Sequence, residues 1–207
     1  MNDLTVGNEA KKILFFAFPI LLSNIFQQLY NIVDAIIVGR LLGEKELAAV
    51  GAAITLYSVI LAVALGLTLG LSILISIYFG ERNSEKIKKA VSTGIIVSMI
   101  ITIFITLTGV VFSKPLLSMV NVPENIINLS NTYLVVLFSG MFTVFGYNLF
   151  TNVLRGLGDT KSSLYILILS SVLNIFLDLL FVYFFKWSVF GAALATVLAQ
   201  FFSLVTV

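Results

Sequence analysis

Six long apolar stretches cover most of the sequence and leave few ways for the chain to fold. Each is about as long as, or longer than, the roughly 20 residues that a helix needs to cross a bilayer. The stretches lie near residues 13–39, 47–79, 90–112, 126–154, 162–185 and 189–207. Because they are apolar on every face and do not alternate, an outer-membrane barrel is excluded. The sequence therefore predicts an all-α polytopic membrane protein, with a six-helix bundle as a single transmembrane domain over residues 1–207.

Charge and residue usage exclude several classes of function. Only 11% of the 207 residues are charged and 59% are hydrophobic, whereas about a quarter of the residues in a soluble domain are charged. The net charge of +2, without a dense basic patch, excludes nucleic acid as a partner. The chain has no Cys and no His, so disulfides, zinc sites and thiolate or imidazole catalysis are excluded. We therefore expect no enzyme activity and no cofactor.

The distribution of Lys and Arg predicts which end of the bundle faces the cytoplasm. Eight basic residues lie at one end and four at the other; the first set is Lys11, Lys12, Arg82, Lys86, Lys88, Lys89, Arg155 and Lys161, and the second is Arg40, Lys45, Lys114 and Lys186. Because cytoplasmic loops carry the excess of Lys and Arg, we expect a multi-pass protein of the cell membrane with a cytoplasmic N-terminus. The segment 80–89 is predicted to be a solvated loop at that end. The last stretch reaches Val207 without a basic residue, so we expect the chain to be cut within or at the end of this helix.

Two carboxylates fall inside predicted membrane helices. Asp34 lies in the segment 27–40, QQLYNIVDAIIVGR, and Asp178 lies in SSVLNIFLDLLF. A charged Asp near the bilayer centre costs roughly 2.5–3.5 kcal/mol on insertion scales, and such residues usually face a bundle interior and mark ion or proton pathways. Asp34 and Asp178 are therefore the leading candidates for functional residues.

Helical spacing places further polar side chains near these carboxylates, because residues three or four apart share a face. With a rise of about 1.5 Å per residue, Asp34, Asp178 and Thr196 fall at about 9–12 Å below the outer ends of their helices. The candidates on four helices are Gln27, Tyr30 or Asn31, Asp34, Asn148, Asn152, Asn174, Asp178, Thr196 and Gln200. The spacing predicts one pocket in the outer half of the bundle, lined by two carboxylates, two amides and a hydroxyl.

Such a pocket suits ion coupling. Oxygen atoms of Asp, Asn and Thr are ligands for a hard cation, and two nearby carboxylates in a poorly solvated site tend to share a proton. The alternative is that these side chains only bridge helices by hydrogen bonds, worth about 0.6 kcal/mol on average in a membrane. For Asn148, Asn152 and Thr196 taken alone, both interpretations remain open.

Several segments carry a resemblance to a known family: FPILLSNIFQQLYNIVDAIIVGRLLGEKELAAVG, GLTLGLSILISIYFGERN, NVLRGLGDTK, and LNIFLDLLF followed by GAALATVLAQ. Together they resemble the N-terminal six-helix lobe of the multidrug and toxic compound extrusion (MATE) transporters. The resemblance implies a cation-coupling site for Na+ or H+, whose residues, and Na+ ligands in a sodium-coupled protein, are Asp34, Asn174, Asp178 and Thr196. It also implies supporting roles for Tyr30 and Asn148, to which the spacing adds Gln27 and Asn152.

The same resemblance implies a secondary active antiporter that moves Na+ or H+ inward and an organic, drug-like and often cationic compound outward. In that family the substrate cleft lies between two six-helix lobes, and the sequence holds one. The implied partners are membrane lipids, the organic substrate, and either a missing C-terminal lobe or a second copy paired in the same orientation.

Three alternatives accompany this interpretation. A lipid-linked oligosaccharide flippase of related architecture would need cationic side chains in its central cavity, and the predicted helices hold none away from their ends. An intramembrane aspartyl protease could use two aspartates as an acid/base dyad, but its Tyr-Asp and Gly-x-Gly-Asp patterns are absent, since Val33 precedes Asp34 and Leu177 precedes Asp178. The third alternative is a truncated half that does not transport.

Overall fold

The computed structural model describes residues 9–206, and the prediction of an all-α fold is confirmed. The elements are α1 (Glu9–Leu41), α2 (Glu44–Gly80), α3 (Ser84–Met119), α4 (Glu124–Ser139), α5 (Met141–Gly156), α6 (Thr160–Asp178), the π-helix η1 (Leu179–Phe184) and α7 (Ser188–Thr206). Residues 1–8 and Val207, which the predicted domain includes, lie outside the described residues, as do the side chains of Glu9, Lys12 and Ala64. In the described part, five helical segments are long and apolar enough to span a membrane, and there are six if the bent pair of α4 and α5 counts as one span.

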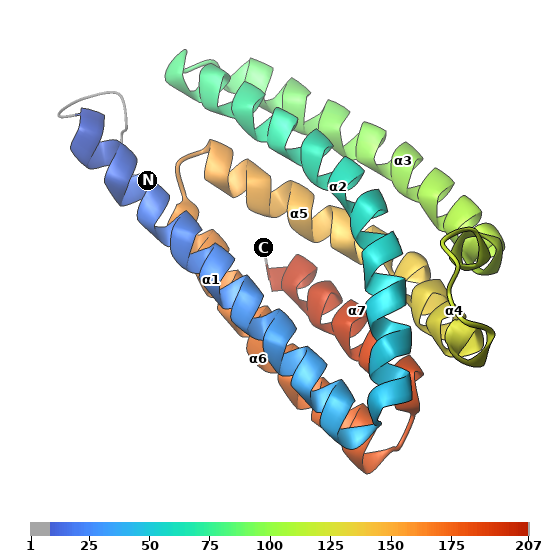
Figure 1. Cartoon of the computed structure of the whole chain (residues 1–207). Helices are drawn as coiled ribbons and strands as arrows, with labels where there is room; N and C mark the ends of the chain where they lie inside the picture. The colour runs from blue at the N-terminus through green and yellow to red at the C-terminus, as the bar shows by residue number, and fades with distance from the viewer. Residues whose placement is uncertain (1–8, 207) are drawn as a thin grey trace.

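The bundle has two flanks joined by α7 (Figure 1). On one flank α1 packs along α6, and on the other α2 packs against α3, α4 and α5. Helix α7 contacts α4, α5 and α6 and therefore lies inside the bundle. The start of α1, the α2–α3 connection and the α5–α6 connection lie at the same end (Figure 1). This is the end that carries the larger set of Lys and Arg.

The single helix predicted over 126–154 is wrong, because α4 and α5 are separate helices that meet at Gly140 with a bend of 51°. Gly140 faces Val197 of α7, and a Cβ added to this glycine would overlap the valine side chain. The close approach of α7 at this point leaves room only for a hydrogen atom, so glycine suits the bend.

The helix predicted over 162–185 is also divided, since the α-helical part ends at Asp178 and the chain continues as η1. The N–H of Phe185 donates to the carbonyl of Leu180, five residues earlier, at 3.0 Å. The rings of Phe181 and Phe185 stack on Trp187 with centroids 5.3 and 5.2 Å away. This aromatic cluster closes the turn that brings α7 back against α6. Single π-helical turns occur frequently at functional sites.

The loop predicted over 80–89 is wrong beyond Asn83, because α3 begins at Ser84. The side chain of Asn83 caps this helix by accepting a hydrogen bond of 3.0 Å from the N–H of Lys86. Lys86, Lys88 and Lys89 therefore stand on the first turns of α3.

The largest buried cluster lies toward the opposite, less basic end of the bundle. It joins Val38 of α1, Val50 of α2, Leu117 of α3, Leu134 of α4 and Val189 of α7. Large apolar side chains remain exposed along the outer faces, for example Phe18 and Phe104, which are 61% and 67% exposed. In a membrane such faces contact lipid. Apolar side chains of this protein are therefore either packed against each other in the core or exposed to the bilayer.

Candidate cation-binding site

Asp34 of α1 and Asp178, the last residue of α6, meet inside the bundle. Asp34 is 7% exposed and Asp178 is 0% exposed. Their carboxyl groups interact at hydrogen-bonding range, as the packing of α1 along α6 allows. Neither carboxylate forms a salt bridge with a described Lys or Arg. Two acidic groups therefore share one buried space without a basic partner.

The oxygen atoms around this pair lack hydrogen-bond donors. Among the residues that the structure describes, no Lys, Arg, amide or hydroxyl group donates a hydrogen bond to four buried acceptors: Oδ1 of Asp34, Oδ1 and Oδ2 of Asp178, and Oδ1 of Asn174. A buried acceptor left unsatisfied costs about 1–3 kcal/mol, and most buried polar groups in proteins are satisfied. A proton shared by the carboxylates, or a cation bound among these oxygens, would remove that cost. The arrangement is a cluster of buried oxygens that a positive charge would stabilise.

Asn174 and Thr196 complete one side of the cluster. The Nδ2 group of Asn174 donates to Oγ1 of Thr196 at 3.4 Å, and the threonine hydroxyl donates to the carbonyl of Ala192 at 3.2 Å. This pairing turns the amide donor of Asn174 toward α7 and leaves its carbonyl oxygen unpaired. The small, fully buried Ala192 and Ala195 allow α7 to pack closely against its neighbours.

Two tyrosines, Tyr30 and Tyr133, are neighbours of the carboxylates. Tyr30 of α1 is close enough to Thr196 for a side-chain hydrogen bond and is an electrostatic neighbour of Asp34. Tyr133 of α4, 3% exposed, is a neighbour of Asp34 and Asp178, and it is also close to Tyr57 of α2. A phenol can donate a hydrogen bond to a carboxylate, so these side chains can orient the pair.

Tyr57 and Tyr133 were not predicted from the sequence. The depth count contained a signal for one of them, because Tyr133 lies about 14 Å below the start of α4 at Glu124. That depth is close to the level predicted for Asp34 and Asp178.

Three predicted candidates have other surroundings or other hydrogen-bond partners. Gln27 is exposed on α1. Asn148 donates to the carbonyl of Val144 in its own helix at 2.8 Å. Asn152 donates to the carbonyl of Asn148 at 2.9 Å and to Oγ1 of Thr68 at 3.1 Å, which links α5 to α2. The last contact is the helix-bridging hydrogen bond that the sequence left as an alternative for Asn152.

Comparisons with known proteins place this chain in a family. The MatE family model matches residues 19–180. Two probable multidrug resistance proteins of Bacillus subtilis (strain 168) are similar: YpnP is 33% identical over 198 residues, 96% of this chain and 44% of YpnP, and YoeA is 34% identical over 188 residues, 89% of this chain and 41% of YoeA.

Solved structures agree with the sequence comparison. The outward-facing conformation of a multidrug resistance MATE family transporter of the MOP superfamily has a TM-score of 0.91 and 32% identity to this chain. The match covers 97% of this chain and 44% of that one, in its N-terminal half. The chain spans about half the length of the curated relatives it matches. It belongs to the MATE family, whose members are transporters and not enzymes.

Proposed function

We propose that this chain is the ion-coupling lobe of a secondary active efflux transporter that exchanges Na+ or H+, moving inward, for organic, drug-like compounds moving outward. The observation that carries the proposal is the cluster of four buried oxygens on Asp34, Asn174 and Asp178, for which the described part of the chain supplies no hydrogen-bond donor. A buried charge is expensive unless it is paired. The coupling ion supplies the missing positive charge. When the ion is released, the free-energy cost of the unpaired buried oxygens returns.

The position of the pair indicates how ion binding acts on the fold. Asp34 and Asp178 belong to different helices, so an ion held between them fastens α1 to α6. Without the ion, two carboxylates at close range repel each other, and this repulsion is strong where water is excluded. If the ion binds the conformation with α1 packed on α6 more tightly than the conformation with these helices apart, it shifts the equilibrium toward the packed conformation. The size of the shift is set by the difference between the two affinities. We therefore assign the packing of α1 on α6 as the element that responds to the ion gradient.

The substrate and the partner follow from the family. The similar Bacillus proteins are named as probable multidrug resistance proteins, which supports an organic, often cationic substrate. The missing surface of the cleft comes from a C-terminal lobe or a second copy of the chain. The greater number of Lys and Arg at the end where α1 begins supports a cytoplasmic N-terminus in the cell membrane.

The alternatives are less well supported. Membership of a transporter family excludes the intramembrane protease. A flippase for a pyrophosphate-linked lipid needs a cationic cavity, whereas the carboxylate pair has no salt bridge to a described Lys or Arg. A half that does not transport would still hold the ion cluster but would give no efflux.

The test is efflux of a fluorescent organic cation, such as ethidium, from cells that lack their own multidrug pumps. The chain is expressed alone and together with the C-terminal half of YpnP. We expect ion-dependent efflux in at least one combination, and its loss in Asp34→Asn and Asp178→Asn. Glu44→Gln is the matched control, because Glu44 is an exposed carboxylate in the first turn of α2. Undiminished efflux in both aspartate variants, at equal amounts in the membrane, would refute the assignment.

A further inference from the structure

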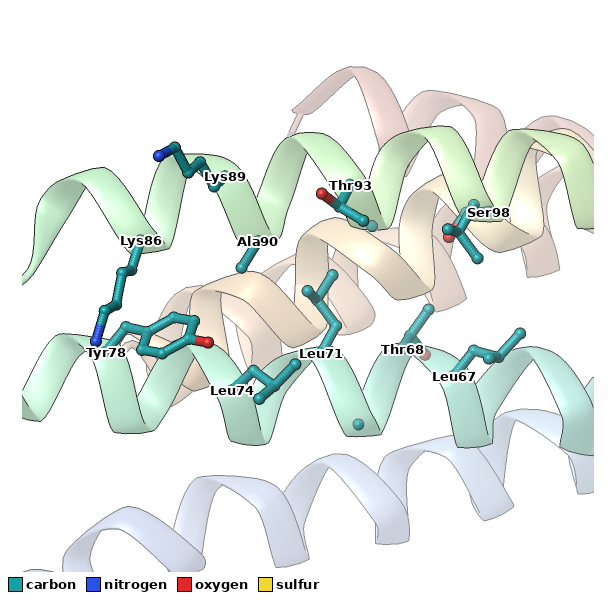
Figure 2. A pocket seen from close by; sticks show the side chains of 13 residues that line it. Leu67, Thr68, Leu71, Leu74, Tyr78, Lys86, Lys89, Ala90, Thr93 and Ser98 are labelled. Atoms are coloured by element: carbon teal, nitrogen blue, oxygen red, sulfur yellow. The ribbon is translucent and has the colours of Figure 1, made fainter.

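A groove lies between α2 and α3 (Figure 2), and its lining includes Lys86 and Lys89 but neither Asp34 nor Asp178. The groove is open along one side and has a volume of about 550 Å³, within the range of about 300–1,000 Å³ typical of ligand sites. Leu67, Leu71 and Leu74 of α2 form one wall, and Ala90 of α3 faces them. Tyr78 and Lys86 lie at the end next to the α2–α3 connection. We call this feature the α2–α3 groove.

The length of the α2–α3 groove matches one leaflet of a bilayer. Between Leu67 and Tyr78 the helix rises by about 16 Å, and half of a hydrocarbon core of about 30 Å is about 15 Å. Leu67 and Leu74 are 40% and 46% exposed, so this wall is open to an apolar ligand. An acyl chain that lies along α2 would therefore reach from the bilayer surface to near its middle.

Positive charge is concentrated where the α2–α3 groove meets the surface. Lys86 reaches from α3 toward α2 (Figure 2), with its ammonium group 2.8 Å from Oε2 of Glu81 and 5.3 Å from the centre of the Tyr78 ring. Its side chain remains 51% exposed, so a further partner can reach it. Residues 81–89 hold four basic and two acidic side chains, which leaves an excess of two positive charges. Lys89 lines the same end and pairs with Glu85 at 2.8 Å.

We propose that the α2–α3 groove binds one anionic phospholipid from the leaflet at the basic end. Lys86 contacts the headgroup phosphate, and one acyl chain lies along Leu67, Leu71 and Leu74. A neutral phospholipid fills the same apolar wall but leaves the excess charge of the 81–89 segment unbalanced. Near a membrane surface each Lys or Arg favours anionic lipid by about fivefold. This proposal does not depend on the ion-coupling role of Asp34 and Asp178.

Two glycines of α2 provide a way to close the groove without touching its charges. A Cβ added at Gly70, which lines the cavity, meets nothing within 4 Å. A leucine there has space to enter and occupies the volume of the acyl chain. Gly66 lies one turn earlier and is equally open, but it does not line the cavity. Gly66→Leu is therefore the matched control for Gly70→Leu.

The experiment is native mass spectrometry of the purified chain with equal amounts of phosphatidylglycerol and phosphatidylcholine that carry the same acyl chains. We expect one tightly retained lipid per chain, preferentially phosphatidylglycerol. Lys86→Gln should reduce the preference by about fivefold, and Lys86→Arg should retain it. Lys88→Gln, which changes a lysine that does not line the groove, should reduce the preference less than Lys86→Gln does. Gly70→Leu should reduce retention of both lipids, and Gly66→Leu should not.

Three results would overturn the proposal. One is equal retention of the two lipids by the unmodified chain. Another is an equal loss of preference in Lys86→Gln and Lys88→Gln, which would indicate attraction to the whole basic surface and not to the groove. The third is unchanged retention in Gly70→Leu. If Lys86→Gln does not fold, Lys86→Arg and the two glycine variants still test the proposal.

Discussion

The carboxylate pair and the α2–α3 groove both carry charged side chains in a membrane protein, but those side chains differ in burial and in pairing. Asp34 and Asp178 are buried and acidic, and three of their carboxylate oxygens have no hydrogen-bond donor among the described residues. Lys86 and Lys89 are half or more exposed, and each already has a carboxylate partner. Because a buried unpaired charge is far more expensive than an exposed one, a ligand changes the energy of the first site much more than that of the second. The pair is suited to coupling, and the groove to selective lipid contact.

The two regions also differ in packing: side chains are more tightly packed near α7 than on the α2–α3 side. At Gly140, where α7 crosses near the main core, an added Cβ would overlap Val197. At Gly66 and Gly70, on the α2–α3 side, an added Cβ meets nothing within 4 Å. A rigid region can hold an ion site of fixed geometry, whereas an open one can accept ligands of variable shape.

The largest expected effect is on stability: binding of the coupling ion should stabilise the protein through the carboxylate pair and not through the α2–α3 groove. The coupling ion should raise the free energy of unfolding by about 2.7 kcal/mol at 100 times its dissociation constant. Asp178→Asn should remove this gain, while Lys86→Gln should keep it. Denaturant unfolding in bicelles, across a Na+ series and separately a pH series, measures the effect. An equal gain in Asp178→Asn would show that the ion binds elsewhere.

The next effect tests the difference in packing. Gly140→Ala should lower the free energy of unfolding by about 1–3 kcal/mol, because the methyl group overlaps Val197. Adding Val197→Ala should recover part of the loss. Gly70→Ala is the control and should be neutral or stabilising, since alanine favours a helix. A neutral Gly140→Ala would contradict the close packing of α7.

A smaller effect is expected at Thr196, which lies at the edge of the oxygen cluster formed by Asp34, Asn174 and Asp178. Thr196→Val removes the hydroxyl that pairs with Asn174 and should weaken ion binding by about threefold, corresponding to the roughly 0.6 kcal/mol of a membrane hydrogen bond. Thr196→Ser should bind as the unmodified chain does. Isothermal titration compares the three proteins. A loss as complete as that of Asp178→Asn would make Thr196 a principal ligand and not a peripheral one.

The smallest effect is expected in the groove. Glu81→Gln breaks an exposed salt bridge and should change the free energy of unfolding by less than about 1 kcal/mol. It should also increase the preference for phosphatidylglycerol, because Lys86 no longer shares its charge with Glu81. Unfolding and native mass spectrometry on the same preparation measure both quantities. A decrease in the preference would contradict the role given to Lys86.

The sequence was sufficient to place the carboxylates at one level, because the rise of a helix is constant. The structure has Asp34 and Asp178 in contact range and Asn174 hydrogen-bonded to Thr196. Their role in ion coupling remains a prediction. Gln27 shares the helical stripe of Asp34 but is exposed, since coverage of a face depends on neighbouring helices. Figure 1 shows α1 and α2 close at their connection and separate further along.

The breaks in the helices could not be predicted in the same way. Gly66 and Gly70 lie inside an unbroken α2, while Gly140 lies at a bend. What distinguishes Gly140 is Val197, a residue of another helix. The π-helix after Asp178 depends in the same way on the stacking of Phe181 and Phe185 with Trp187. Tertiary contacts of this kind leave no local pattern in the sequence.

Direct ion binding tests the central claim that Asp34 and Asp178 hold the coupling ion. Binding of radioactive Na+, and proton release or uptake, are measured on the chain in lipid nanodiscs. We predict saturable binding of one of these ions to the unmodified chain and to Glu44→Gln, and its loss in Asp34→Asn and Asp178→Asn. Unchanged binding in both aspartate variants, or no saturable binding of either ion to the unmodified chain, would contradict the claim.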